Sequence, residues 1–150
     1  MSTQTIDHQT LELRRTFPVS RERLFAAWTD PEEFRQWFGP DSCRVLDVSM
    51  DVRVGGRYVV TIAGEGDEVM KNAGEFREVN PPSRLVYTWG WANDPDWDGV
   101  DSIVTVDFIE QPGGAEVRVS HQRFPSAESR GRHEYGWTGA LENLAAYVAR

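Results

Sequence analysis

Histidines, a run of aspartates and one cysteine are the residues of this sequence whose side chains could do chemistry. The histidines are His8, His121 and His133, and the cysteine is Cys43. Their positions match neither a paired CxxC nor an HExxH motif, so the spacing predicts no zinc site. An imidazole can act as a general base or as a hydrogen-bond partner of a ligand. His121, which ends an alternating apolar run, is our only candidate catalytic residue.

Two interpretations of His121 compete. It could be a general base, with Glu75 or Asp107 as a second acid–base group. It could also be a structural histidine bonded to the backbone near the start of the last helix, which we favour because buried polar groups are normally hydrogen-bonded. Ser120 cannot serve it as a nucleophile, since neighbours on a strand point to opposite faces. The segment Gly64-Glu65-Gly66 lacks the third glycine of a dinucleotide-binding loop and indicates a turn, so no cofactor is predicted.

The aspartate run at residues 94–99 resembles the start of a calcium loop. Asp94, Asp96 and Asp98 alternate and are followed by glycine, as in D-x-D-x-D-G. In a calcium loop such carboxylates converge on one ion, but the closing glutamate is replaced here by Thr105. The alternative, which we favour, is an acidic solvated loop, with no metal bound. Trp97 in this loop, with the nearby Trp91, could form a lid over one end of a cavity.

Composition places the chain among ordinary globular proteins. Its 150 residues are 39% hydrophobic and 27% charged, which fits a single domain over residues 1–150 with a substantial core. We expect residues 1–8 to be flexible. No apolar run approaches the roughly 20 residues of a membrane span. The first residues lack the basic and apolar regions of a secretory signal.

Charge and cysteine content restrict the compartment and the partners. The formal net charge of −8 argues against nucleic acid or an anionic membrane as a partner. Cys43 is the single cysteine, so no internal disulfide can form and a reducing cytoplasm is the expected location. A monomer or a homodimer fits the sequence equally well.

The stretch from Ser126 to Arg150 predicts a long amphipathic helix. Its apolar stripe recurs at intervals of four, three and four residues and consists of Trp137, Leu141, Leu144 and Val148. Ser126 can cap the first turn. Gly136 and Ala140 lie beside the stripe, where small side chains either let another surface come close or leave a gap. Such a helix must pack against the rest of the chain.

The remainder of the chain predicts short strands and two short helices. A first strand covers residues 9–17, and Ser20 and Asp30-Pro31 then each begin a short helix. The further strands are expected at residues 45–50, 57–63, 69–79, 84–91, 102–110 and 115–122. Residues 93–99 are expected to be a polar loop. Short turns between consecutive strands favour one antiparallel sheet, and the chain as a whole is α+β.

Alternation suggests which side chains face the terminal helix. Aromatic residues alternate in the strand that contains Tyr87, Trp89 and Trp91. Such a wall is either solid core or the lining of a ligand cavity, and the sequence leaves both open. The predicted cavity residues are Trp37, Tyr58, Val60, Met70, Asn72, Tyr87, Trp89, Trp91, Val104, Val119, His121, Trp137, Leu141 and Leu144.

Several segments, in this order, resemble one known family. They are residues 25–31 (FAAWTDP), 37–40 (WFGP), 54–58 (VGGRY), 74–79 (GEFREV) and 81–89 (PPSRLVYTW), followed by His121, Phe124, Gly136-Trp137, Leu141 and Leu144. Together they are similar to the activator of heat shock protein 90 ATPase homolog family, within the START-like helix-grip superfamily. The resemblance implies a curved sheet of six or seven antiparallel strands that grips the C-terminal helix, with a cavity between them.

Three functions remain under this resemblance. Superfamily relatives bind lipids, hormones or polyketides, which favours a module that holds a small hydrophobic or amphipathic molecule between helix and sheet. The family's eponymous co-chaperone suggests a stress-response protein that stimulates a heat-shock-90-type ATPase. A cyclase- or hydrolase-like enzyme using the same cavity is the third. We rank them in this order. A fold alone does not fix a function, so the site has to decide between them.

Overall fold

The computed structural model describes residues 9–39, 41–64, 66 and 68–150. Residues 1–8, which include His8 and are predicted to be flexible, lie outside the described residues. So do Pro40 of the resembling segments and Glu65 of the predicted turn. The elements in chain order are β1 (Leu11–Phe17), α1 (Arg21–Thr29), α2 (Pro31–Phe34), β2 (Arg44–Met50), β3 (Arg57–Ala63), β4 (Val69–Asn80), β5 (Arg84–Ala92), η2 (Pro95–Trp97), β6 (Ser102–Gln111), β7 (Gly114–Gln122) and α3 (Ala127–Val148).

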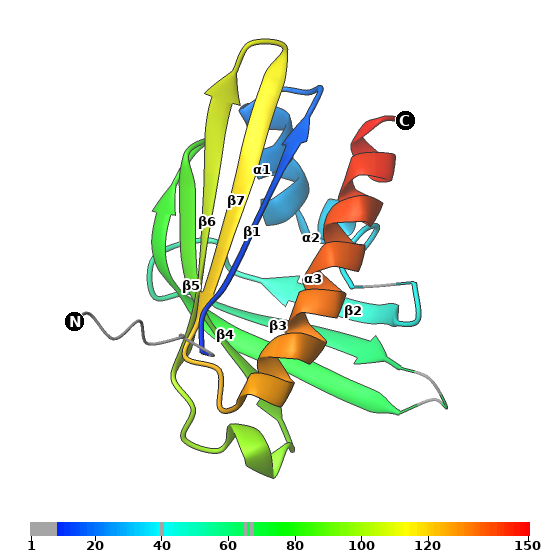
Figure 1. Cartoon of the computed structure of the whole chain (residues 1–150), viewed down its shortest axis with the longest axis vertical. Coiled ribbons are helices and arrows are strands. Elements are labelled where there is room, and N and C mark those ends of the chain that lie inside the picture. The colour runs from blue at the N-terminus through cyan, green and yellow to red at the C-terminus, as the bar shows by residue number, and fades with distance from the viewer. Residues whose placement is uncertain (1–8, 40, 65, 67) are drawn as a thin grey trace, which may run out of the picture.

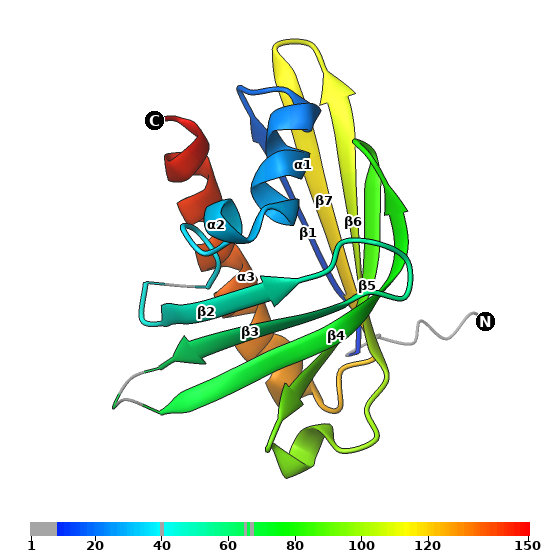
Figure 2. The same cartoon turned by 180° about the vertical axis from the view of Figure 1, so that it is seen from behind.

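One seven-stranded sheet organises the chain (Figure 1), with strand order β1-β7-β6-β5-β4-β3-β2. Every neighbouring pair is antiparallel, and β1 returns to pair with β7, where Leu11 lies opposite His121. Figure 2 shows the sheet from behind, with β2–β4 crossing the direction of β6 and β7. Helix α3 runs across β2–β4 inside this bend. The predicted α+β fold, a curved antiparallel sheet around a C-terminal helix, is confirmed.

Irregularities in the strands allow this curvature. The register shifts between Val45 and Asp47 on β2, and again between Phe76 and Glu78 on β4. Such bulges bend a strand and increase its local twist. Gly74 on β4 lies where the backbones come very close, because a Cβ there would be 2.0 Å from the carbonyl oxygen of Thr88. Only glycine fits this bend.

The helices begin where the sequence predicts. The hydroxyl of Ser20 accepts the backbone N–H of Arg23 at 3.1 Å, and a carboxylate oxygen of Asp30 accepts that of Glu32 at 2.9 Å. Ser126 caps α3 in the same way, accepting the N–H of Ser129 at 3.0 Å. These bonds satisfy amides that have no partner inside the helix.

The stripe of α3 is buried as predicted, and so is its neighbour Ala140. The indole of Trp137 stacks on that of Trp28 from α1, with centroids 6.1 Å apart. Beside the stripe, a Cβ on Gly136 would meet nothing within 4 Å. Gly136 therefore leaves a gap beside the stripe and does not let another surface come close.

The prediction of a polar loop at residues 93–99 is wrong in its centre. Pro95–Trp97 form the short helix η2, and the side chain of Asp94 accepts the backbone N–H of Asp96 to cap it. Trp97 is only 6% exposed and packs against Phe124 and His133. Trp97 is thus a core residue, because its large apolar surface outweighs the polar residues around it. Within the described ranges, no helix is long and apolar enough to cross a membrane.

Candidate functional site

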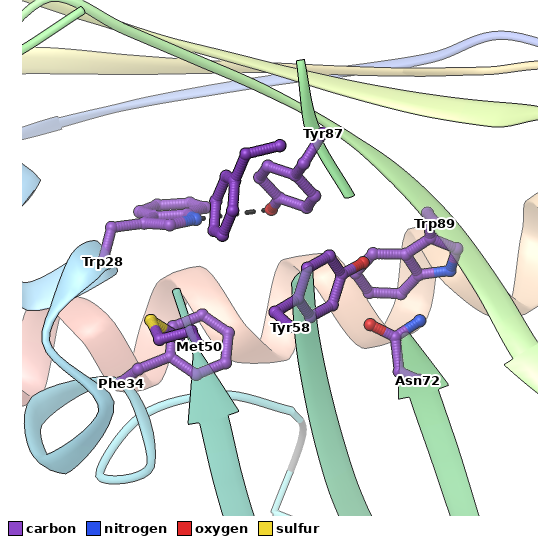
Figure 3. A pocket seen from close by; sticks show the side chains of 8 residues that line it. Trp28, Phe34, Met50, Tyr58, Asn72, Tyr87 and Trp89 are labelled. Atoms are coloured by element: carbon purple, nitrogen blue, oxygen red, sulfur yellow. Dashed lines mark hydrogen bonds between the residues drawn. The ribbon is translucent and has the colours of Figure 1, made fainter. Parts of the chain in front are cut away.

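An apolar pocket lies on the inner face of the sheet (Figure 3). It is lined by side chains from α1, α2, β2, β3, β4 and β5, namely Trp28, Phe34, Met50, Tyr58, Asn72, Phe76, Tyr87 and Trp89. Its volume of about 20 Å³ is enough for roughly one water molecule. The pocket is therefore mainly a meeting point of aromatic rings.

Three of these rings form one wall. The Tyr58 and Tyr87 rings meet edge to face with centroids 5.4 Å apart, and Phe76 lies 5.8 Å from each of them. Edge-to-face contacts of this kind are favourable because the positive edge of one ring meets the negative face of another. The three rings therefore stabilise one another.

The polar atoms in the pocket are nearly all engaged. Trp28 donates its indole N–H to the hydroxyl of Tyr87 at 3.3 Å, and the hydroxyl of Tyr58 donates to the carbonyl of Thr88 at 2.8 Å. The side-chain amide of Asn72 donates to the carbonyl of Gly90 at 3.1 Å. Its oxygen, Oδ1, is buried and has no partner among the described residues.

The pocket carries no formal charge at neutral pH. Burial raises the pKa of Tyr58 well above its ordinary value, and burial likewise raises the pKa of Tyr87. Both phenols are therefore neutral, and the other lining side chains do not ionise. An environment of this kind penalises a charged guest.

Four of the predicted cavity residues line this pocket: Tyr58, Asn72, Tyr87 and Trp89. The others do not. His121 is buried elsewhere, and Met70 and Trp91 are partly buried and pack against the core. The rest belong to the solid core, namely Trp37, Val60, Val104, Val119, Trp137, Leu141 and Leu144. Sequence reasoning missed Trp28, Phe34, Met50 and Phe76. Trp28 and Phe34 lie on the two predicted short helices, and helical spacing does not reveal what the apolar face of a helix meets.

A second buried cluster surrounds His121. Its Nδ1 accepts the indole N–H of Trp137 at 3.2 Å, and its Nε2 lies 3.2 Å from the hydroxyl of Ser102. That hydroxyl donates to the carbonyl of Trp89 at 2.7 Å. The proton of the neutral imidazole must then be on Nε2, where it points at Ser102.

His133 on α3 completes this cluster. Its Nδ1 lies 2.8 Å from the carbonyl of Ser129 and so carries the proton. Its Nε2 accepts two indole N–H groups, from Trp89 at 3.2 Å and from Trp91 at 3.0 Å. Burial lowers the pKa of His133 to about 4 and that of His121 well below its ordinary value. Both imidazoles are neutral at pH 7.

These contacts decide between the two interpretations of His121. It is 0% exposed, does not line the pocket, and has both ring nitrogens engaged. The structural interpretation therefore fits, except that its partners are the side chains of Ser102 and Trp137 rather than the backbone. Asp107 pairs with Arg84 at 2.7 Å on the outer face of the sheet. Glu75, also on that face, pairs with a neighbouring arginine, so neither acid serves the histidine.

The aspartates of the calcium-like motif are not gathered around one point. In the part of the chain that the structure describes, no three of its histidine, cysteine, aspartate or glutamate side chains are placed to hold a metal ion. Asp94 uses its carboxylate as a helix cap, and Pro95–Trp97 turn into η2. The carboxylates of Asp94, Asp96 and Asp98 therefore do not have the convergent arrangement that a calcium loop requires.

Comparison with known proteins agrees with the fold. The family described as Activator of Hsp90 ATPase homolog 1-like protein matches residues 18–149. The crystal structure of the AHSA1 protein from Silicibacter pomeroyi is 34% identical, covers 93% of this chain and 97% of its own, and superposes with a TM-score of 0.81. A crystal structure from Chromobacterium violaceum is 27% identical, covers 95% and 98% of the two chains, and has a TM-score of 0.83. None of the curated proteins matches the chain.

Proposed function

The chain belongs to the Activator of Hsp90 ATPase homolog 1-like family, and we propose that it binds a small, mainly apolar molecule between the sheet and the helices. The observation that carries this proposal is the convergence of aromatic side chains from separate elements on one uncharged pocket. Apolar pockets with a few polar groups are the usual form of small-molecule sites. The ligand would be uncharged, because the pocket offers no charge to pair with it.

Binding requires the pocket to open. Ligand sites usually measure 300–1,000 Å³, whereas this pocket has about 20 Å³. We expect the pocket to open by movement of Met50 and Phe34. Met50 is partly buried on the edge strand β2, and methionine adapts easily because its side chain is flexible and unbranched. Phe34 ends the four-residue helix α2. We place the route into the pocket between these two elements.

Native mass spectrometry of the protein as purified from cells tests this function. The expected result is a stoichiometric small molecule that organic solvent extracts. Met50→Trp should fill the pocket and abolish its retention. Met70→Trp is the matched control, since Met70 is also partly buried but does not line the pocket. Equal retention by both variants would contradict binding at this site. If the mass shows no bound molecule, the protein is titrated directly with an aromatic probe. The proposal predicts saturable binding in this titration.

The description of the family favours a second candidate, stimulation of a heat-shock-90-type ATPase. This activity would need an exposed contact surface rather than a pocket. Leu46 and Val54, at and just after the edge strand β2, are exposed apolar side chains that could contribute to one. The chaperone's ATPase rate, measured with and without the chain, tests this candidate. Met50→Trp separates the two functions, because it should stop ligand binding and leave stimulation unchanged.

An enzyme using the same pocket finds no support in its lining. Only Tyr58 and Tyr87 of the lining residues can ionise, and burial raises the pKa of both. A general acid or base works best with a pKa near the operating pH. We therefore propose no reaction for this pocket. The cytoplasmic location and the monomeric or dimeric state stay predictions from the sequence.

A further inference from the structure

We infer that the ligand of this pocket carries an N–H or O–H group, which donates a hydrogen bond to the side-chain oxygen of Asn72. The inference rests on the proposed function, because it specifies the chemical class of the molecule that the pocket binds. The class is an uncharged, flat aromatic compound with at least one donor, such as an indole-like or phenol-like molecule.

The position of Asn72 keeps its side chain away from solvent. Asn72 lies on β4 between two paired strands, opposite Val60 on β3 and Trp91 on β5. It is 0% exposed and belongs to the lining of the pocket. Bulk water therefore does not reach its amide oxygen in this structure.

A hydrogen bond to the backbone fixes the orientation of the Asn72 amide. Nδ2 donates to the carbonyl oxygen of Gly90 at 3.1 Å. Rotating the amide by half a turn would bring two oxygens together, which is repulsive, so Oδ1 is the atom left over. Figure 3 shows this oxygen on the side of Tyr58 and the nitrogen on the far side.

The donors of the pocket lining do not satisfy Oδ1: three are used elsewhere, and the hydroxyl of Tyr87 makes no hydrogen bond to it. The indole N–H of Trp28 goes to Tyr87, that of Trp89 goes to His133, and the hydroxyl of Tyr58 goes to Thr88. Among the described residues Oδ1 has no partner. Buried polar atoms in native proteins are nearly always hydrogen-bonded, so the missing donor belongs to a molecule outside the chain.

The aromatic lining identifies the rest of that molecule. Rings of Trp28, Tyr58, Tyr87 and Trp89 offer faces and edges to a flat guest. The hydroxyl of Tyr87 accepts from Trp28, and its own hydrogen has no acceptor among the described residues. A ligand oxygen can accept this hydrogen while the ligand's donor meets Asn72. A lone water would use the same two atoms but would leave the aromatic lining unmatched.

Calorimetric titration with two probes of nearly equal shape tests the inference. Indole has an N–H donor and benzothiophene has none. We expect the preference for indole over benzothiophene to fall about tenfold in Asn72→Leu, the effect typical of one buried hydrogen bond. Asn143→Leu is the matched control, because Asn143 also donates its amide to a backbone carbonyl, that of Gly39 at 2.9 Å, but lies outside this pocket.

The outcomes separate the inference from the function on which it rests. If the wild type binds both probes and Asn72→Leu keeps the wild-type preference, the pocket binds ligands but Asn72 does not select them, and the inference is overturned. If the wild type binds neither probe, both the proposed function and the inference fail. If Asn72→Leu does not fold, a measurement on the wild type alone still tests the inference. The N–H of bound ¹⁵N-indole should exchange slowly with water, and solvent-like exchange would overturn the inference.

Discussion

Trp137 on α3 donates its indole N–H to Nδ1 of His121 on β7 across 3.2 Å. Both side chains are almost fully buried, at 3% and 0% exposure. This bond joins the C-terminal helix to the strand that lies between β1 and β6 in the sheet. Because a buried donor left without its acceptor is costly, the bond also fixes where the helix sits along the sheet.

Trp137→Ala should lower the free energy of unfolding by about 3–5 kcal/mol, through loss of buried surface and creation of a cavity. Trp137→Phe keeps most of the ring but removes the donor to His121, and should cost about 1–3 kcal/mol. Urea denaturation followed by circular dichroism measures both. A cost below about 1 kcal/mol for Trp137→Ala would mean that α3 is not part of the core.

His121→Ala should lower the free energy of unfolding by about 2–4 kcal/mol, because it leaves Trp137 without an acceptor and Ser102 without its imidazole partner. Ser120→Ala is the control, since Ser120 precedes it on the outer face of β7 and should change stability by less than about 0.5 kcal/mol. If urea denaturation gives the same change in the free energy of unfolding for both substitutions, the structural role assigned to His121 is contradicted.

Stability should fall as the pH drops from about 6.5 to about 4. The pKa of His133 is about 4 in the folded chain against 6.5 for an ordinary histidine, so the unfolded chain binds more protons in this interval. The contribution of His133 is fully present above pH 6.5, is lost progressively down to pH 4, and amounts to about 3 kcal/mol. His121, whose pKa is lowered by burial as well, acts in the same direction.

Thermal unfolding at several pH values checks this dependence. His133→Gln retains an acceptor for the indole groups of Trp89 and Trp91 but cannot take up a proton. The variant should lose less stability than the wild type between pH 6.5 and pH 4. Identical pH profiles would show that His133 is not held neutral by the fold.

Two glycine substitutions should act in opposite directions. Gly136→Ala in α3 places a methyl group in open space and should stabilise the chain by about 0.5–1 kcal/mol, because alanine is the better helix former. Gly74→Ala would place Cβ 2.0 Å from a backbone oxygen and should destabilise the bent strand β4. Urea denaturation measures both, and a stable Gly74→Ala variant would contradict the close approach of β4 and β5.

Most of the fold could be predicted because its signals are local. The caps at Ser20, Asp30 and Ser126 and the spacing of the stripe in α3 each follow from residues close in sequence. Trp97 was misplaced because its burial depends on Phe124, which is distant in sequence. Local polarity could not indicate that contact.

The candidate site was harder to predict, because it is assembled from separate elements. Alternation on β3, β4 and β5 identified Tyr58, Asn72 and Tyr87, but periodicity cannot reveal which helix residues meet them. The role of Ser102 was missed for the same reason, since its partner His121 lies on the neighbouring strand β7. The register of β6 and β7, with Val104 opposite His121, is visible only in the structure.

The most direct test of ligand binding is an NMR titration of the tryptophan indole N–H signals with indole. Trp28 and Trp89 line the pocket, whereas Trp97 packs against Phe124 and does not. We predict saturable shifts of the Trp28 and Trp89 signals, with that of Trp97 changing least. Signals that stay in place, or that all move in proportion to added indole without saturating, would contradict a binding site in this pocket.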